Sequence, residues 1–163
     1  MKIGIVVYSQ TGNTLSVASK LYEELKKEGN KVSLIRVEAK RNIKQNTFEI
    51  IKTPNVEEYD IIVFASFVEA FRLNPVMKKY LENIETLKNK NIFVFITQML
   101  PYTWLGGNQT LKQMVNICRQ KEGNIIGSGI INWKNKLRDE KTHDLIDKIV
   151  SQLKGIKQHE KKH

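Results

Sequence analysis

The residues best suited to chemistry stand in one short stretch, Ser-Gln-Thr-Gly-Asn-Thr at residues 9–14. The stretch follows an apolar run and precedes an amphipathic one, so we expect a loop between a buried strand and a helix. Backbone N–H groups at a helix N-terminus attract anions, and Gly12 lets the backbone curl closely around a ligand. The hydroxyl groups of Ser9, Thr11 and Thr14 add donors for phosphate oxygens.

The composition of this loop restricts the kind of phosphate. The loop contains no Lys or Arg, and the glycine spacings of nucleoside triphosphate loops and of dinucleotide folds are both absent. A terminal phosphomonoester held by neutral donors remains. The alternative is a capped helix start with Ser9 or Thr11 as N-cap, which explains one hydroxyl and the glycine but leaves two hydroxyls without a role. The predicted phosphate-binding residues are Ser9, Gln10, Thr11, Gly12, Asn13 and Thr14.

Around this loop, short apolar runs alternate with amphipathic segments. The alternation predicts an α/β fold with a doubly wound five-stranded parallel sheet of order 2-1-3-4-5 and helices on both faces. Ligands bind such sheets at the carboxyl ends of the strands, where the 9–14 loop begins. We expect one domain at 1–155, a disordered basic tail at 156–163, and a loop with at most a short helix at 38–58. Strands are predicted at 2–8, 31–37, 59–66, 91–97 and 124–133, and helices at 13–28, 75–87, 111–123 and 143–153.

Residues 9–14 match T/S-x-T-G-x-T, the phosphate loop of the flavodoxin family, and the chain resembles that family along most of its length. The segments 74–84 and 106–114 also resemble the tryptophan-repressor-binding-protein type of NAD(P)H:quinone reductase. The family resemblance implies an FMN cofactor whose phosphate lies on residues 9–14. It also implies that the isoalloxazine ring lies between residues 66–72 and 97–107.

These two loops are suited to a flat ring on their own account, because aromatic residues stand in them at strand ends. Trp104 lies well inside a loop, which favours a role in binding, whereas Phe67 directly follows a strand and could equally fill the core. Gly106 and Gly107 either permit close approach of the backbone to the flavin or only form a turn that begins a helix. The predicted ring-binding residues are Ser66, Phe67, Val68, Glu69, Phe71, Thr97, Gln98, Met99, Tyr102, Trp104, Gly106 and Gly107.

The charge of the chain departs from the family pattern, because electron-carrier flavodoxins are strongly acidic and this chain has a formal net charge of +10. The excess is spread along the chain, which is typical of solvated faces, and acidic partners are the alternative reading. Without an aromatic-interleaved basic stripe we expect no nucleic-acid partner. The predicted function is FMN-dependent electron transfer with a redox partner protein. The alternative is an FMN-dependent oxidoreductase that passes electrons from NAD(P)H to a quinone or a similar small acceptor.

The remaining features exclude other classes of site. The single cysteine, Cys118, argues against an intrachain disulfide and a cysteine-held cluster, and its helical spacing with apolar residues predicts a buried thiol. No spacing of His, Cys and carboxylates indicates a metal site. No apolar run is long enough to cross a bilayer and no leader segment is recognised, so we expect a cytoplasmic protein. A homo-oligomer stays an open alternative to a monomer.

Overall fold

The fold is organised around a parallel β-sheet with the first strand inside it. In this computed structural model, which describes residues 1–163, five parallel strands lie in the order β2-β1-β5-β7-β8. The predicted α/β fold with a parallel sheet and covering helices is confirmed, and the structure adds three short strands to it. The parallel strands are β1 (Lys2–Val7), β2 (Lys31–Arg36), β5 (Ile61–Glu69), β7 (Asn91–Gln98) and β8 (Asn124–Asn132).

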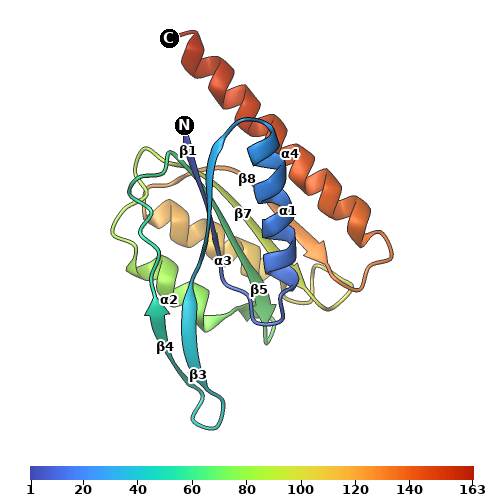
Figure 1. The fold of residues 1–163 in the computed structure, drawn as a ribbon. Coiled ribbons are helices and arrows are strands. Elements are labelled where there is room, and N and C mark those ends of the chain that lie inside the picture. The colour runs from blue at the N-terminus through green and yellow to red at the C-terminus, as the bar shows by residue number, and fades with distance from the viewer.

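Helices cover both faces of the sheet because its central strands are apolar on both sides. Helices α1 (Asn13–Lys27) and α4 (Arg138–Lys161) lie on one face, and α2 (Pro75–Asn83) and α3 (Gly107–Gln120) lie on the other (Figure 1). Alternate residues of a strand point to opposite faces, so Ile5 belongs to the core under α1 and α4, whereas its neighbour Val6 belongs to the core under α2 and α3.

Two helices are longer than the sequence predicts. Helix α3 begins at Gly107, four residues before the predicted 111, because Gly106 adopts a left-handed conformation that ends the preceding loop. Helix α4 begins at Arg138 and continues to Lys161, through most of the segment 156–163 that was expected to be a disordered tail. Ile156 packs on the core beneath α4, and lysine, glutamine and glutamate favour helix, so the helix has both packing and propensity to extend it.

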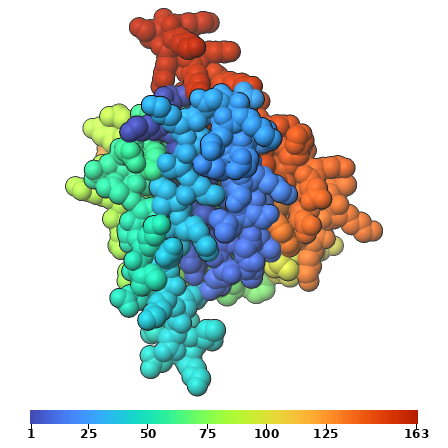
Figure 2. All heavy atoms as spheres, viewed as in Figure 1, coloured from blue at the N-terminus to red at the C-terminus, as the bar shows by residue number.

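The expectation of a loop at 38–58 is wrong, because β3 (Glu38–Asn42) and β4 (Thr47–Lys52) form an antiparallel hairpin there. Only Ala39, Phe48 and Ile50 of the hairpin pack on the core, so its apolar pattern is too sparse to predict a strand. Figure 1 shows the hairpin extending past the end of β5. In Figure 2 the hairpin and the end of α4 project from opposite ends of the molecule.

The predicted loop at 66–72 is also largely β-structure. Strand β5 continues to Glu69, and the two-residue strand β6 (Arg72–Leu73) returns antiparallel to it. Ala70 and Phe71 form the turn, both with positive φ, of 49° and 65°. Such values match the primed turns that the twist of a tight hairpin favours.

None of the helices is both long and apolar enough to pass through a lipid bilayer.

Candidate functional site

The loop after β1 leaves the start of α1 open. Gly12 is the N-cap residue, with a φ of 89°, and no side chain caps the helix. The first hydrogen bond of the helical ladder runs from Ser16 N to Gly12 O at 2.9 Å. The N–H groups of Asn13 and Thr14 therefore have no acceptor within the helix and can donate hydrogen bonds to a ligand. A Cβ atom added at Gly12 would meet nothing within 4 Å, so the outer side of the loop is unobstructed.

Two of the three loop hydroxyls already have partners within the protein. Ser9 Oγ accepts a hydrogen bond from Gly12 N at 3.1 Å and so closes the turn. The side chain of Thr14 is buried, with its Oγ1 2.8 Å from Thr97 Oγ1 and 3.4 Å from the carbonyl oxygen of Ser66. The expectation that a plain helix start leaves two hydroxyls without a role is therefore wrong. The third hydroxyl residue, Thr11, is exposed.

The end of β5 belongs partly to the core. Ser66 is buried and its hydroxyl donates to the carbonyl oxygen of Tyr8 at 3.4 Å. The ring of Phe67 stacks on that of Tyr8, with centroids 5.6 Å apart. Phe67 therefore packs against the core, which was one of its two expected roles. Val68 is half-buried and pairs with Leu73 of β6. These residues support the neighbouring turn rather than project toward solvent.

Glu69 is held by a residue that the sequence analysis missed. Its carboxylate accepts two hydrogen bonds from Arg41 of β3, and these hydrogen bonds raise the pKa of the Arg41 guanidinium. Burial raises the pKa of the nearby Tyr8 hydroxyl, and the charge of Arg41 opposes that rise. No signal pointed to Arg41, because its contact with Glu69 exists only once the hairpin has formed.

Two side-chain amides hold the loop after β7. Gln98 Nε2 donates to the carbonyl oxygens of Leu100 at 2.9 Å and Tyr102 at 2.6 Å. Asn132 Nδ2, at the end of β8, donates to the carbonyl oxygen of Pro101 at 2.9 Å. The oxygen atoms of both amides are buried and accept no hydrogen bond from the protein. Asn132 was missed, although a polar residue that ends an apolar strand was a usable signal.

The aromatic side chains of this loop are exposed. The rings of Tyr102 and Trp104 stack on each other with centroids 5.8 Å apart, and the two residues are 58% and 66% exposed. Met99 is also exposed, and its sulfur lies 3.5 Å from Asn13 Nδ2 of the first loop. Phe71 is exposed on the turn after β5. The structure thus brings the predicted phosphate and ring residues together at one end of the sheet.

Gly106 and Gly107 allow close approaches within the protein itself. Gly106 has a φ of 102°, and a Cβ atom added to it would lie 2.6 Å from Phe71 Cα. A Cβ atom at Gly107 would collide with the side chain of Gln98. Gly106, the N-cap residue of α3, therefore lets the loop after β7 touch the turn after β5, and Gly107 lets the start of α3 pack on Gln98 at the end of β7. Contact of these glycines with a ligand stays a prediction.

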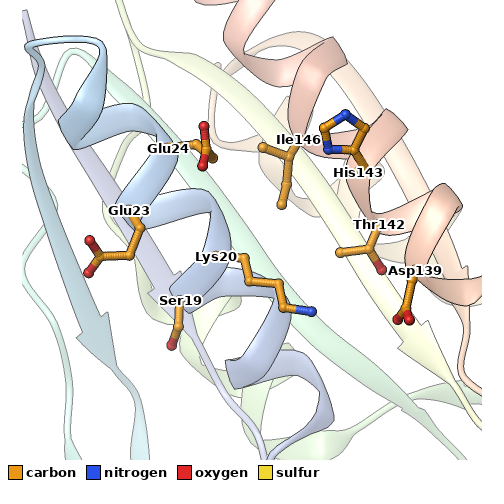
Figure 3. Close-up of a pocket in the computed structure, with 8 residues that line it drawn as sticks. All are labelled: Ser19, Lys20, Glu23, Glu24, Asp139, Thr142, His143 and Ile146. Atoms are coloured by element: carbon orange, nitrogen blue, oxygen red, sulfur yellow. The ribbon is translucent and has the colours of Figure 1, made fainter.

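The candidate site lies at the carboxyl ends of the strands and is separate from a cavity between helices α1 and α4. That cavity, of about 460 Å³, is lined by residues of α1 and α4, among them Glu23, Asp139 and His143 (Figure 3). None of its lining residues belongs to the loops after β1, β5 and β7. Carboxylates from both helices line this cavity and would repel a phosphate, so it does not suit phosphate binding.

A family model described as "Flavodoxin domain" matches residues 5–161 of the chain. No curated protein matches its sequence. The resemblance of residues 74–84 and 106–114 to quinone reductases of the tryptophan-repressor-binding type stays a prediction.

Solved structures of flavodoxins share the fold. Oxidised flavodoxin 1 from Bacillus cereus superposes with a TM-score of 0.68 at 16% identity, covering 94% of this chain and 98% of that one. Oxidised flavodoxin 2 from Bacillus cereus superposes with a TM-score of 0.65 at 20% identity, covering 90% of this chain and 95% of that one. A flavoprotein from Lactobacillus acidophilus, solved in complex with FMN, gives 0.60 at 17% identity, covering 86% and 98%.

Proposed function

The chain belongs to the flavodoxin domain family, and we propose that it binds FMN at the carboxyl ends of its parallel strands and serves electron transfer. The observation that carries the proposal is the open N-terminus of α1 beside the exposed aromatic pair Tyr102 and Trp104. The first suits a phosphate and the second a flat ring. Only β5 lies between β1 and β7, so the two loops start about 10 Å apart, a spacing that suits a cofactor with both parts.

The phosphate would be held mainly by backbone groups. The N–H groups of Asn13 and Thr14 stand at the positive end of the α1 dipole, which favours a dianion. The exposed hydroxyl of Thr11 is free to donate, and Ser9 can donate its hydroxyl proton while its oxygen accepts from Gly12. Thr14 would act through its buried side chain, which fixes the loop on Thr97.

The ring would be held by exposed aromatic side chains. Tyr102, Trp104 and Phe71 offer flat surface that is exposed in the protein and would be covered by the ring. The amides of Gln98 and Asn132 would act indirectly, because their N–H groups hold the loop that carries the two aromatic rings. Bound FMN would supply one- and two-electron redox chemistry, and the protein would supply its position and its electrostatic surroundings.

The charges near the ring loops are positive in sum. Arg41 forms an ion pair with Glu69 and neutralises its charge. The neighbouring Arg72 is exposed and forms no ion pair. Positive surroundings stabilise an added negative charge, so we expect the bound cofactor to be reduced at a higher potential than in an acidic flavodoxin. About 59 mV corresponds to a tenfold change in a one-electron equilibrium. A strongly negative final potential in a redox titration would contradict this part of the proposal.

The first experiment is an absorption spectrum of the purified protein after FMN is added and the excess removed. We expect flavin bands that stay with the protein and a quenched flavin fluorescence. Tryptophan emission should also fall, by less in Trp104→Phe than in Trp133→Phe, because only Trp104 stands in the ring loops. A protein that retains neither FMN, riboflavin nor FAD would refute the proposal. Rapid oxidation of NAD(P)H by the loaded protein would favour the oxidoreductase alternative.

A further inference from the structure

Exposed apolar side chains gather at one end of this molecule. Seven of the eight exposed large hydrophobic residues stand in four segments at the carboxyl ends of the strands or at the hairpin turn. We name these segments, 42–46, 70–72, 99–104 and 133–138, the carboxyl-end face. Concentration of apolar surface in this way marks a site of interaction. The seven residues are Ile43, Phe71, Met99, Leu100, Tyr102, Trp104 and Leu137.

The proposed cofactor accounts for only part of this surface. Ile43, 92% exposed, stands at the tip of the β3–β4 hairpin, and Leu137, 51% exposed, follows β8. Both lie outside the loops at 66–72 and 97–107 between which the ring is expected. A macromolecule that spans the whole edge would cover them together. Five strands at about 4.8 Å spacing make an edge of about 20 Å, which suits a protein interface of about 800 Å² per partner.

The hairpin presents its tip in a fixed position. Arg41 joins it to Glu69 at the end of β5, and Phe48 and Ile50 pack on the core. Figure 1 shows the hairpin turn lying beyond the end of the sheet, where a partner seated on the carboxyl-end face would meet it. Because these contacts are made before binding, little conformational entropy would be lost when Ile43 is covered.

The charges of the face are sorted by sign. Its segments hold five cationic side chains and no carboxylate; the adjacent Glu69 is paired with Arg41, and Asp139 in α4 lies 3.6 Å from Arg138. The loops at the opposite end of the strands, 28–30, 53–60, 84–90 and 121–123, hold six carboxylates and three lysines. The carboxyl-end face therefore attracts an acidic surface. Its cations are Lys44, Arg72, Lys134, Lys136 and Arg138.

We propose that the carboxyl-end face docks an acidic redox protein, with Ile43 and Leu137 in contact and the five cations around them. The redox character of the partner rests on the proposed function, which brings electrons to this same end of the sheet. A second copy docked face to face is disfavoured, because two such faces would repel each other, and a head-to-tail copy would perturb signals at the opposite end of the sheet in the test below. Nucleic acid or an anionic membrane would satisfy the cations but would leave the electrons without an acceptor.

The test uses an acidic [2Fe–2S] ferredoxin as the probe and the ¹⁵N-labelled chain with and without FMN. Amide signals of the hairpin turn and of segment 133–138 should shift or broaden, and binding should weaken as salt is raised. Charge reversal by Lys134→Glu with Lys136→Glu should weaken binding about tenfold. The matched control, Lys161→Glu with Lys162→Glu at the end of α4, changes the net charge equally and should have less than about a twofold effect.

The apolar part of the face is tested separately by Ile43→Ser, which removes an exposed side chain and should fold normally. This variant should weaken binding of the probe severalfold without changing the response to salt. Equal losses in the two charge-reversed variants, or perturbed signals at the opposite end of the sheet, would overturn the docking proposal. So would absence of probe binding by an FMN-loaded chain that binds single-stranded DNA or phosphatidylglycerol vesicles instead.

The same titration separates the two proposals. A chain that docks the probe on this face but retains no flavin would refute the proposed function and keep the docking surface. A chain that retains FMN but fails to bind the probe would overturn the docking surface and keep the proposed function.

Discussion

The side chains of Arg41 and Glu69 meet at two points, Nη1–Oε1 at 2.5 Å and Nη2–Oε2 at 3.1 Å, and so join the β3–β4 hairpin to the end of β5. The pair is mostly shielded from solvent, with side-chain exposures of 20% and 29%. Two-point geometry and partial burial make such a pair stronger than an ordinary surface ion pair. The hairpin thereby supports the turn that carries Phe71.

We expect Arg41→Met and Glu69→Gln each to lower the free energy of unfolding by about 1 kcal/mol, and the double variant to cost little more than either. Urea unfolding of the four proteins measures the coupling. The control cycle uses Lys2→Met and Glu58→Gln, whose pair at 3.2 Å is far more exposed, at 53% and 60%. Coupling of the same size in both cycles would show that the hairpin pair has no special role.

Thr11 and Thr14 should respond differently to removal of the hydroxyl. Thr14→Val leaves the buried Thr97 hydroxyl without its partner, so it should lower the free energy of unfolding by about 1–3 kcal/mol. Thr11→Val should change stability by less than about 0.5 kcal/mol but weaken FMN binding about tenfold, because it removes a donor to a charged phosphate. Urea unfolding and flavin fluorescence titration give the two readouts. A stable Thr14→Val protein that has lost its FMN affinity would place the Thr14 hydroxyl on the ligand instead.

Alanine substitutions at three glycines should distinguish the stability cost of backbone strain from that of a steric collision. Gly155→Ala, in α4 with nothing within 4 Å, should stabilise the protein by about 0.5–1 kcal/mol. Gly12→Ala should cost about 1 kcal/mol, since its φ is 89° but the space is open. Gly106→Ala should cost about 2 kcal/mol or more, because it adds a collision with the Phe71 backbone to a φ of 102°. Thermal or urea unfolding ranks them, and equal costs at Gly12 and Gly106 would contradict the close loop contact.

Cys118 should make stability fall in mild alkali. Burial raises the pKa of its thiol from 9.0 to about 12, so the folded state keeps the proton that the unfolded state loses. The contribution is complete below the unfolded pKa and is lost as pH rises toward the folded one. The free energy of unfolding should be about 1.4 kcal/mol lower at pH 10 than at pH 8, with the fall much reduced in Cys118→Ala. Equal slopes in the two proteins would contradict a buried thiol.

The strands that build the binding edge were predictable because their pattern is strong and local. Strands β1, β5 and β7 are runs of apolar residues buried on both faces, and such runs identify central strands of a parallel sheet. The order of elements then places the loop 9–14 at the carboxyl end of β1. The sequence by itself therefore determined the fold class, the position of the loop and the set of loops that neighbour it.

The tertiary structure alone decided how the side chains at that edge are used. Arg41 reaches Glu69 across 28 residues, and Thr14 reaches Thr97 across 83, so no local pattern can indicate either contact. The hairpin itself has one sparse buried face, and its apolar residues become meaningful only when the core beneath them exists. Hydroxyls and charges bond to whatever lies nearest after folding, and that is why their partners follow from packing rather than from spacing.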